Sequence, residues 1–233
     1  MSEADLVYYV QCSEPFPGSE VFMSLTISLE KEIKIIFNNF SKTLRYDIRK
    51  VIDAESQFEY HFIENAGACE GQNFISLYNP FCKQKNLRKP NINFLEFLAA
   101  HNAMSISYIR DKSDKKEVFC GHLYIRDGDF CRLLYSFHFN NKERHSNPKV
   151  YQNLNKFLHF KDIVKFKKIG IRTYDFGGVS QQKTNIDSFK LRFGGVIIKS
   201  YSGINKNTKF GSIVLNMSIF LVRIFKQAKV FLP

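Results

Sequence analysis

The sequence predicts an α/β (α+β) fold in which a central, mixed but largely antiparallel sheet is flanked by helices. Three runs of alternating apolar and polar residues follow one another between residues 104 and 139, with turn sequences between them. Segments with helical spacing precede and follow these runs. Alternation indicates strands, a spacing of three to four residues indicates helices, and short turns join antiparallel neighbours. Strands grouped in the chain, with helices on either side, are typical of this class.

The first hundred residues predict a βαβ unit followed by further helices. A short alternating run at 25–29 indicates a strand, and residues 30–53 carry apolar side chains at the spacing of one helix. Residues 58–63 indicate the next strand. Apolar positions beyond it predict helices that are broken around Pro80 and Pro90, because proline lacks the N–H that a helix interior needs.

The middle of the chain predicts an antiparallel meander. Its three strands are expected at 104–110, 118–126 and 130–139. Asp127-Gly128-Asp129 joins the last two, and Asp-Gly is a strong hairpin signal because glycine tolerates a positive φ.

Helices and strands alternate after the meander. Asn147 and Pro148 open a long helix that runs through Lys168, and Gly170 is its expected stop. The remaining elements are a strand at 171–176, a helix at 185–193 and a strand at 196–201.

Composition predicts one compact body with a strongly basic surface. The chain has 233 residues, is 44% hydrophobic and is rich in Phe and Tyr but has no Trp. We expect an N-terminal portion at 1–100 and the main core at 101–233. The net charge of +12 points to polyanions: nucleic acid, an anionic membrane, or phosphate-rich small molecules such as coenzyme A and nucleotide sugars.

The cysteines and the two ends of the chain predict a cytoplasmic protein. Five scattered cysteines form no C-x-x-C pair, so neither a disulfide framework nor a metal site is expected. The N-terminus has no secretory signal pattern. An apolar run at 213–231 is interrupted by polar and charged residues, whereas a bilayer span needs about 20 mostly apolar residues. We expect a helix that covers the sheet or pairs two subunits in a homodimer, without stable membrane insertion.

Two Phe-Gly-Gly steps, at 176–178 and 193–195, mark a site, because paired glycines imply positive φ or close backbone approach. Asn155 and Lys156 begin a helix core upstream, and residues 41–49 read Ser-Lys-x-x-Arg-x-x-Ile-Arg. Together these motifs resemble the FemAB-like branch of the GNAT acyltransferase superfamily. The resemblance extends over most of the chain, from the helix at 42–50 to the second glycine pair.

The resemblance implies a GNAT fold whose fourth and fifth strands, at 130–139 and 171–176, splay around the acyl donor. It implies an N-acyltransferase that uses acyl-CoA and needs no metal. The expected acceptor is the amine of a nucleotide-linked amino sugar of the dTDP-amino-dideoxyhexose type, in polysaccharide biosynthesis. Two alternatives remain open: a FemAB-like transferase that uses aminoacyl-tRNA on a peptidoglycan precursor, and a non-catalytic polyanion-binding module. The acyl-CoA-dependent enzyme would have no nucleic-acid partner, whereas both alternatives involve nucleic acid or another polyanion.

The expected catalytic residues close the fifth strand and follow it. Tyr174 or Asp175 would move protons, Lys190 would stabilise an oxyanion, and His138 is a further candidate base. Asp175 is equally suited to cap the following turn, and Lys190 to lie on the surface. His122 is another candidate base, and His159 is either a catalyst or a partnered, partly buried histidine.

The expected binding residues are mainly cations. The usual GNAT phosphate loop, Gln/Arg-x-x-Gly-x-Gly/Ala, is missing, and a basic segment precedes the long helix instead. The candidates for holding acyl-CoA are Lys142, Arg144, Lys149, Asn155, Lys156, Gly177 and Gly178. Residues along one helix are the candidates for the acceptor's diphosphate: Lys42, Arg45, Tyr46 and Arg49. Each cluster has the alternative of a solvated basic surface.

Overall fold

The computed structural model describes residues 6–114, 117–139, 148–180 and 184–206. The chain divides into two compact units, of which the larger spans Leu25–Ile197. The smaller unit combines the residues before this span with those after it. The portion boundary predicted at residue 100 lies inside the larger unit, because strands on both sides of it pair with each other.

The smaller unit is built on three strands in the order β1-β8-β2. They are β1 (Leu6–Cys12), β8 (Val196–Lys206) and β2 (Glu20–Ser28), of which β2 and β8 continue into the larger unit. β1 runs antiparallel to β8, with Leu6 opposite Lys206. The sequence analysis did not predict β1.

The larger unit contains a mixed sheet in the order β2-β7-β6-β5-β4-β3. Its remaining strands are β3 (Phe58–Ile63), β4 (Met104–Asp111), β5 (Val118–Asp127), β6 (Phe130–His138) and β7 (Thr173–Gly178). The run from β3 to β6 is antiparallel and β7 joins β6 in parallel. The predicted meander and the largely antiparallel sheet are confirmed.

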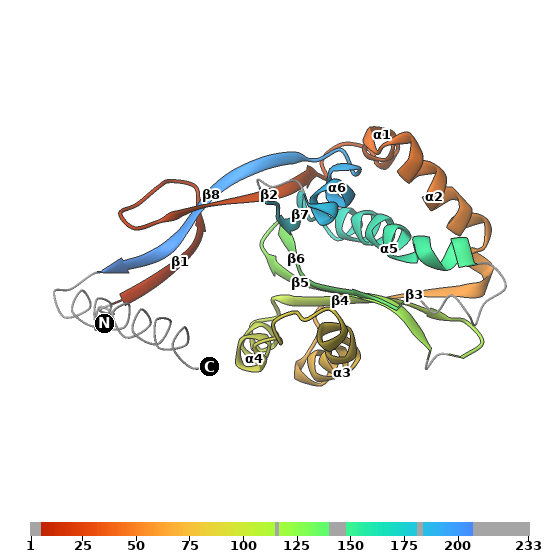
Figure 1. The fold of residues 1–233 in the computed structure, drawn as a ribbon, viewed down its shortest axis with the longest axis horizontal. Helices are drawn as coiled ribbons and strands as arrows, with labels where there is room; N and C mark the ends of the chain where they lie inside the picture. The colour runs from red at the N-terminus through yellow and green to blue at the C-terminus, as the bar shows by residue number, and fades with distance from the viewer. Residues whose placement is uncertain (1–5, 115–116, 140–147, 181–183, 207–233) are drawn as a thin grey trace, which may run out of the picture. The chain divides into compact units, whose positions relative to one another are not determined.

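Helices cover both faces of this sheet (Figure 1). One face carries α1 (Ile33–Asn39), α2 (Lys42–Asp53), α5 (Pro148–Lys168) and α6 (Asn185–Leu191). The other carries α3 (Ala68–Gln84) and α4 (Ile92–Ala100). Each face has its own hydrophobic core, in which large aromatic side chains such as Phe157 and Phe74 are fully buried.

Two predictions about the helices were wrong. The single helix expected at 30–53 is two helices, because Phe40 is extended and buried and Ser41 caps α2 by accepting a hydrogen bond from the N–H of Leu44. Pro80 does not break its helix but lies inside α3, where the helix packs its buried side chains against the sheet. Gly170 ends α5 as expected, with φ +91°.

Strands β6 and β7 share only a short register. Phe130, Cys131 and Arg132 lie opposite Thr173, Tyr174 and Asp175. β6 continues to His138 and β7 to Gly178 beyond this register. At that point Gly177 has φ +76°, and a Cβ there would lie 3.2 Å from the carbonyl oxygen of Leu133. The splayed strands of the predicted fold are therefore present, and glycine bends the second strand where they separate.

None of the helices in the described part of the chain has both the length and the apolar character to cross a membrane. The helix predicted at 213–231 lies outside the described residues.

Candidate active site

The side-chain alternation of the strands gathers polar residues beneath α5. His122 and Tyr124 lie two residues apart on β5, so both point to the same face of the sheet. Ser107 on β4 is directly opposite His122, and Tyr60 comes from β3. α5 crosses above them and contributes Asp162, which is fully buried.

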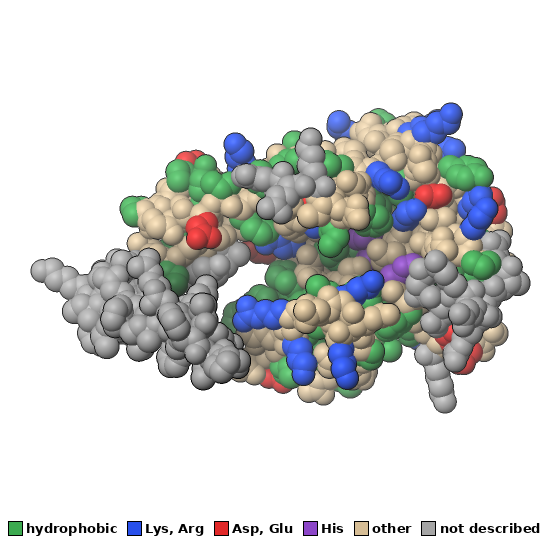
Figure 2. Space-filling view, viewed as in Figure 1, with side chains coloured by type: hydrophobic (Ala, Val, Ile, Leu, Met, Phe, Trp, Pro, Cys, Tyr) green, Lys and Arg blue, Asp and Glu red, His purple; other side chains and the backbone are tan. Residues whose placement is uncertain are grey.

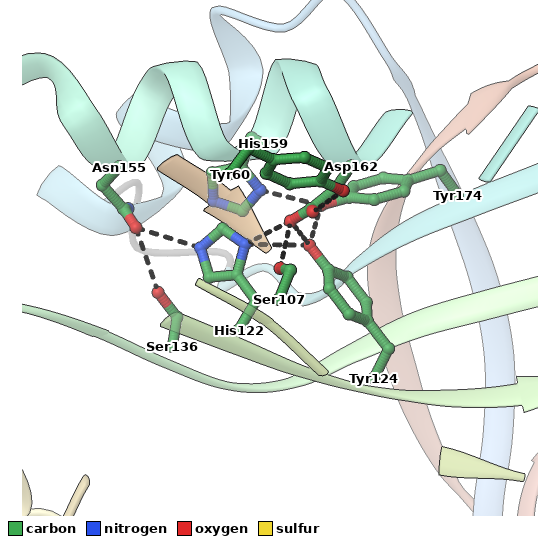
Figure 3. Close-up of polar contacts among 9 residues, drawn as sticks. All are labelled: Tyr60, Ser107, His122, Tyr124, Ser136, Asn155, His159, Asp162 and Tyr174. Atoms are coloured by element: carbon green, nitrogen blue, oxygen red, sulfur yellow. Dashed lines mark hydrogen bonds and ion pairs between the residues drawn. The ribbon is translucent and has the colours of Figure 1, made fainter. Parts of the chain in front are cut away.

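Asp162 is the centre of a buried hydrogen-bond network (Figure 3). Its Oδ2 accepts hydrogen bonds from Tyr124 Oη at 2.6 Å, His122 Nδ1 at 2.7 Å and Ser107 Oγ at 2.9 Å. Its Oδ1 accepts one from Tyr60 Oη at 2.9 Å. Four donors satisfy the carboxylate, which a buried charge requires. Burial, and after it the negative charge of Asp162, raises the pKa of both Tyr60 and Tyr124.

The network continues from Tyr124 to α5 through Tyr174. Tyr174 Oη lies 2.8 Å from Tyr124 Oη and 2.8 Å from His159 Nδ1. Because Tyr124 gives its only proton to Asp162, Tyr174 donates to Tyr124, and His159 Nδ1 must donate to Tyr174. The proton assignment leaves the lone pair of His159 on Nε2. Figure 3 shows this second nitrogen on the side of the ring away from Tyr174.

Burial keeps His159 in its neutral form. The side chain is almost completely buried, which lowers its pKa well below the ordinary value, and the nearby His122 and Lys190 lower it further. Its ring is surrounded by aromatic rings, with Phe176 at 4.9 Å and Phe193 at 5.3 Å between centroids. A neutral imidazole whose tautomer is set by its neighbours is suited to accept a proton.

The other end of the network reaches half-buried residues at the splay. His122 Nε2 lies 2.9 Å from Asn155 Oδ1, and Ser136 Oγ donates to the same oxygen at 3.5 Å. Ser136 and His138 belong to the part of β6 beyond its register with β7. His138 Nε2 donates to the carbonyl oxygen of Tyr151, and burial lowers its pKa. Histidine side chains are visible in Figure 2 where α5 passes over the sheet.

Asp175 lies on the opposite face of β7 from Tyr174. Its Oδ2 is 3.1 Å from Arg132 Nη2, and its Oδ1 accepts the N–H of Gly177 at 2.7 Å. Lys190 donates to the carbonyl oxygen of Gly178 at 2.6 Å, and burial lowers its pKa although Asp175 and Asp187 oppose that shift. Asp175 and Lys190 therefore belong to one cluster around the glycine turn, separate from the hydrogen-bond chain of Tyr174.

The basic residues of α2, the helix predicted to bind the acceptor, differ in role: one bonds to neighbouring backbone and two are exposed. Arg45 Nη1 donates to the carbonyl oxygen of Asn38 at 2.6 Å and to that of Phe40, and so holds the end of α1. Lys42 is exposed, and the guanidinium of Arg49 lies 5.5 Å from the centre of the Phe37 ring. Tyr46 is 56% exposed.

The predicted donor-binding residues are dispersed. Lys142 and Arg144 lie outside the described residues. Lys156 Nζ donates to Asp47 Oδ2 at 2.7 Å and so joins α5 to α2, whereas Lys149 is exposed in the first turn of α5. Gly178 accepts the bond from Lys190 and lies beside Gly177 at the splay.

The second glycine pair lies elsewhere. A Cβ on Gly194 would be 2.3 Å from the carbonyl oxygen of Asn39, and one on Gly195 would be 2.5 Å from that of Thr26. This pair allows α1 and β2 to approach the end of α6 closely.

The sequence analysis missed the centre of the site. Asp162, Tyr124, Ser107 and Tyr60 were not candidates, although Asp162 lies three residues after His159 on the apolar face of the predicted helix. A carboxylate on the buried face of a helix is a signal in itself, because a buried charge requires partners. Among the residues described, no group of three or more His, Cys, Asp or Glu side chains is arranged to hold a metal ion.

Comparison with known proteins identifies the fold. No family model matches the sequence, and no curated protein sequence matches it. The crystal structure of FemX is similar with a TM-score of 0.60 and 12% identity, over 87% of this chain and 66% of FemX.

Two further solved structures give the same result. The C-terminal domain of a putative lysylphosphatidylglycerol synthetase from Agrobacterium fabrum has a TM-score of 0.55 and 11% identity, over 88% of this chain and 67% of that one. L-PGS from Bacillus licheniformis has a TM-score of 0.51 and 11% identity, over 88% and 66%. The chain thus spans about two thirds of the length of these proteins and has the GNAT-like fold of FemX.

Proposed function

We propose that this protein is a transferase that moves an aminoacyl group from an activated ester, such as aminoacyl-tRNA, to an acceptor amine. The observation that carries the proposal is the Asp162 network, one end of which reaches Ser136 at the β6–β7 splay of a FemX-like fold. The likeness to a putative lysylphosphatidylglycerol synthetase, whose name describes the attachment of an amino acid, supplies the second argument.

In the proposed reaction, the acceptor nitrogen attacks the ester carbonyl and forms a C–N bond. The C–O bond to the donor breaks, and the leaving oxygen takes a proton. The ammonium form of the acceptor must first lose a proton, for which His159 Nε2 is the proposed base. Tyr174, Tyr124 and Asp162 hold the ring in the required tautomer and stabilise the imidazolium that forms. Tyr174 and Tyr124 keep their own protons, because their pKa values are raised.

The splayed backbone supports the carbonyl in this proposal. The N–H groups of the unpaired strand segments would receive the developing oxyanion, as donors already fixed in position. Lys190, whose Nζ donates to the carbonyl oxygen of Gly178, is the proposed side-chain donor to the same oxyanion.

A second candidate is acyl transfer from acyl-CoA to a nucleotide-linked amino sugar. The exposed cations favour it: Lys149 lies at the N-terminus of the 21-residue helix α5, a position that suits phosphate, and Lys42 and Arg49 are exposed on α2. In this case a C–S bond breaks and coenzyme A leaves as the thiol. The same base would serve both donors.

The experiment compares the donors with hydroxylamine as a general acceptor. Purified protein is mixed with radiolabelled aminoacyl-tRNA or with acetyl-CoA, and the hydroxamate is measured. We expect faster hydroxamate formation from aminoacyl-tRNA than in a control without enzyme. His159→Gln should lower this rate about 100-fold or more, the usual contribution of a general base. Lys112→Gln, at an exposed lysine, is the matched control.

The outcomes separate the proposals. A rate with acetyl-CoA alone supports the second candidate, whereas turnover of neither donor supports a non-catalytic polyanion-binding module. If His159→Gln retains the full rate with a normal thermal unfolding midpoint, the assignment of the base is wrong.

A further inference from the structure

The segment 83–97, which runs from the end of α3 into α4, presents cations beside apolar side chains on the surface. Lys83, Lys85, Arg88 and Lys89 are all exposed. Within the same segment Leu87 is 46% exposed, Phe94 39% and Phe97 56%. The segment contains a single carboxylate, Glu96. Figure 2 shows basic side chains projecting from this end of the α3–α4 layer.

The two phenylalanines are displayed by the packing of α4. Leu95 and Leu98 of this helix are buried in the core beneath it. Phe94 and Phe97 lie three residues apart, hence on one face, and both point away from that core. The exposed rings thus come from a helix whose opposite face is packed against the core. Their exposure is not due to fraying of a helix end.

The exposed rings continue into a basic turn. The N–H of Leu87 bonds to the carbonyl oxygen of Cys82 at 2.9 Å, and the N–H of Phe94 bonds to the side chain of Asn91 at 3.2 Å. The backbone on both sides of Arg88 and Lys89 is therefore held by hydrogen bonds. The cations consequently stay close to the apolar side chains.

Charge and side-chain type together indicate what binds this surface. Exposed Phe and Leu insert at the boundary between headgroups and acyl chains, and adjacent lysines and arginines attract anionic lipids. Single-stranded RNA would use the cations and the aromatic faces, but it gives no role to the aliphatic Leu87. One face of the Phe97 ring is also occupied by His101, at 4.2 Å between centroids.

We propose that residues 83–97 bind the surface of an anionic phospholipid bilayer. Lys83, Lys85, Arg88 and Lys89 contact the phosphates, and Leu87, Phe94 and Phe97 enter the interface. The binding is peripheral and reversible, because only a few apolar side chains enter the lipid. It is independent of the transfer reaction proposed above, since no residue of this segment belongs to the Asp162 network.

Vesicle sedimentation tests the proposal on the full chain. We expect the protein to bind vesicles made of equal parts of phosphatidylglycerol and phosphatidylcholine, and to bind pure phosphatidylcholine much less. Binding to the anionic vesicles should weaken strongly in about 1 M salt, where charges are screened beyond about 3 Å. Equal binding to both vesicles, or to neither, would overturn the proposal.

Variants separate the segment from the overall charge. Arg88→Glu/Lys89→Glu should lower the vesicle partition coefficient at least about 25-fold, since each basic residue near the surface contributes a factor of about five. Phe97→Ser should lower it about tenfold. Lys112→Glu/Lys168→Glu and Ile186→Ser are the matched controls, at exposed positions outside the segment, and should change it less than about twofold.

A thermal unfolding midpoint like that of the unchanged protein shows that each variant folds. Loss of binding in the controls as large as in the segment variants would contradict the assignment. A gel-shift assay with tRNA completes the test. If the segment variants lose tRNA binding while the protein never binds vesicles, the surface binds RNA and the lipid proposal is wrong.

Discussion

Asp162 and Asp175 are two fully buried carboxylates that the fold stabilises in different ways. Asp162 accepts hydrogen bonds from two tyrosines, a serine and a histidine, and it forms no ion pair with an Arg or Lys in the described part of the chain. Asp175 is paired with Arg132 and with the backbone N–H of Gly177. The partners of Asp162 are hydroxyl groups and an imidazole, which both donate and accept hydrogen bonds, whereas a guanidinium and a backbone N–H only donate.

This difference in partners suggests different roles for the two carboxylates. The Asp162 network extends through hydroxyl groups to the neutral His159, and its other end reaches Ser136 at the splay. The Asp175 pair secures the glycine turn that bends β7 away from β6. We therefore infer that the first carboxylate supports proton transfer and the second maintains the shape of the site.

The largest effect is expected from Asp162→Asn. The amide cannot accept all four hydrogen bonds, because its NH2 group faces donors. We expect the free energy of unfolding to fall by about 3–5 kcal/mol, as when one partner of a buried pair is removed. Urea unfolding measures it. Asp53→Asn, at an exposed position on α2, should change it by less than about 0.5 kcal/mol. If Asp162→Asn and Asp53→Asn both change the free energy of unfolding by the same small amount, the hydrogen bonds of Asp162 do not stabilise the fold.

A smaller and recoverable loss is expected at the second carboxylate. Arg132→Met removes the guanidinium beside Asp175 and should cost about 2–3 kcal/mol, because Arg132 is only 14% exposed. The double variant Arg132→Met/Asp175→Asn should recover about 1 kcal/mol or more of that loss, since the uncompensated charge is gone.

The control for this comparison of single and double variants is the exposed pair of Arg172 and Asp129. Their nitrogen and oxygen lie 3.8 Å apart and both side chains are more than half exposed. Arg172→Met should cost less than about 1 kcal/mol. Strictly additive costs for the Arg132 and Asp175 substitutions would show that the two residues are not coupled.

The smallest effect is a change in pH dependence. The pKa of His159 is depressed in the folded state, so the unfolded chain binds the extra proton first as the pH falls. Its contribution to stability is complete above the unfolded pKa of about 6.5 and is lost below it, by about 1.4 kcal/mol per pH unit. In His159→Gln the fall in unfolding free energy between about pH 6.5 and pH 5 should be shallower by this amount. An unchanged slope would mean that His159 is already protonated when folded.

Local patterns predicted most of the fold. The meander, the helix from Pro148 to Lys168 and the strand that ends in a glycine pair follow from periodicity and from the backbone preferences of Gly and Pro. The errors arose where tertiary packing prevailed over a local rule. Burial of Phe40 divides one predicted helix, and the packing of α3 retains Pro80 inside it.

The candidate site was predicted only in part. Tyr174, Asn155 and His138 were selected from the sequence, and they lie near the splay. Arg45 and Lys156 were selected as ligands, yet here they hold helices together through Asn38 and Asp47. A cation looks the same in the sequence whether it binds a ligand or a neighbouring helix.

The sequence by itself determined which elements form and that glycine bends the chain after β7, because these depend on contacts between residues near each other in the chain. Only the tertiary structure decided that Asp162 is the hub of the site. Its partners come from β3, β4 and β5, as far as 102 residues away in the sequence. The face to which Tyr174 and Asp175 each point was likewise settled by the sheet. The physical reason is that hydrogen bonds between distant segments depend on strand register and helix crossing, which no local pattern encodes.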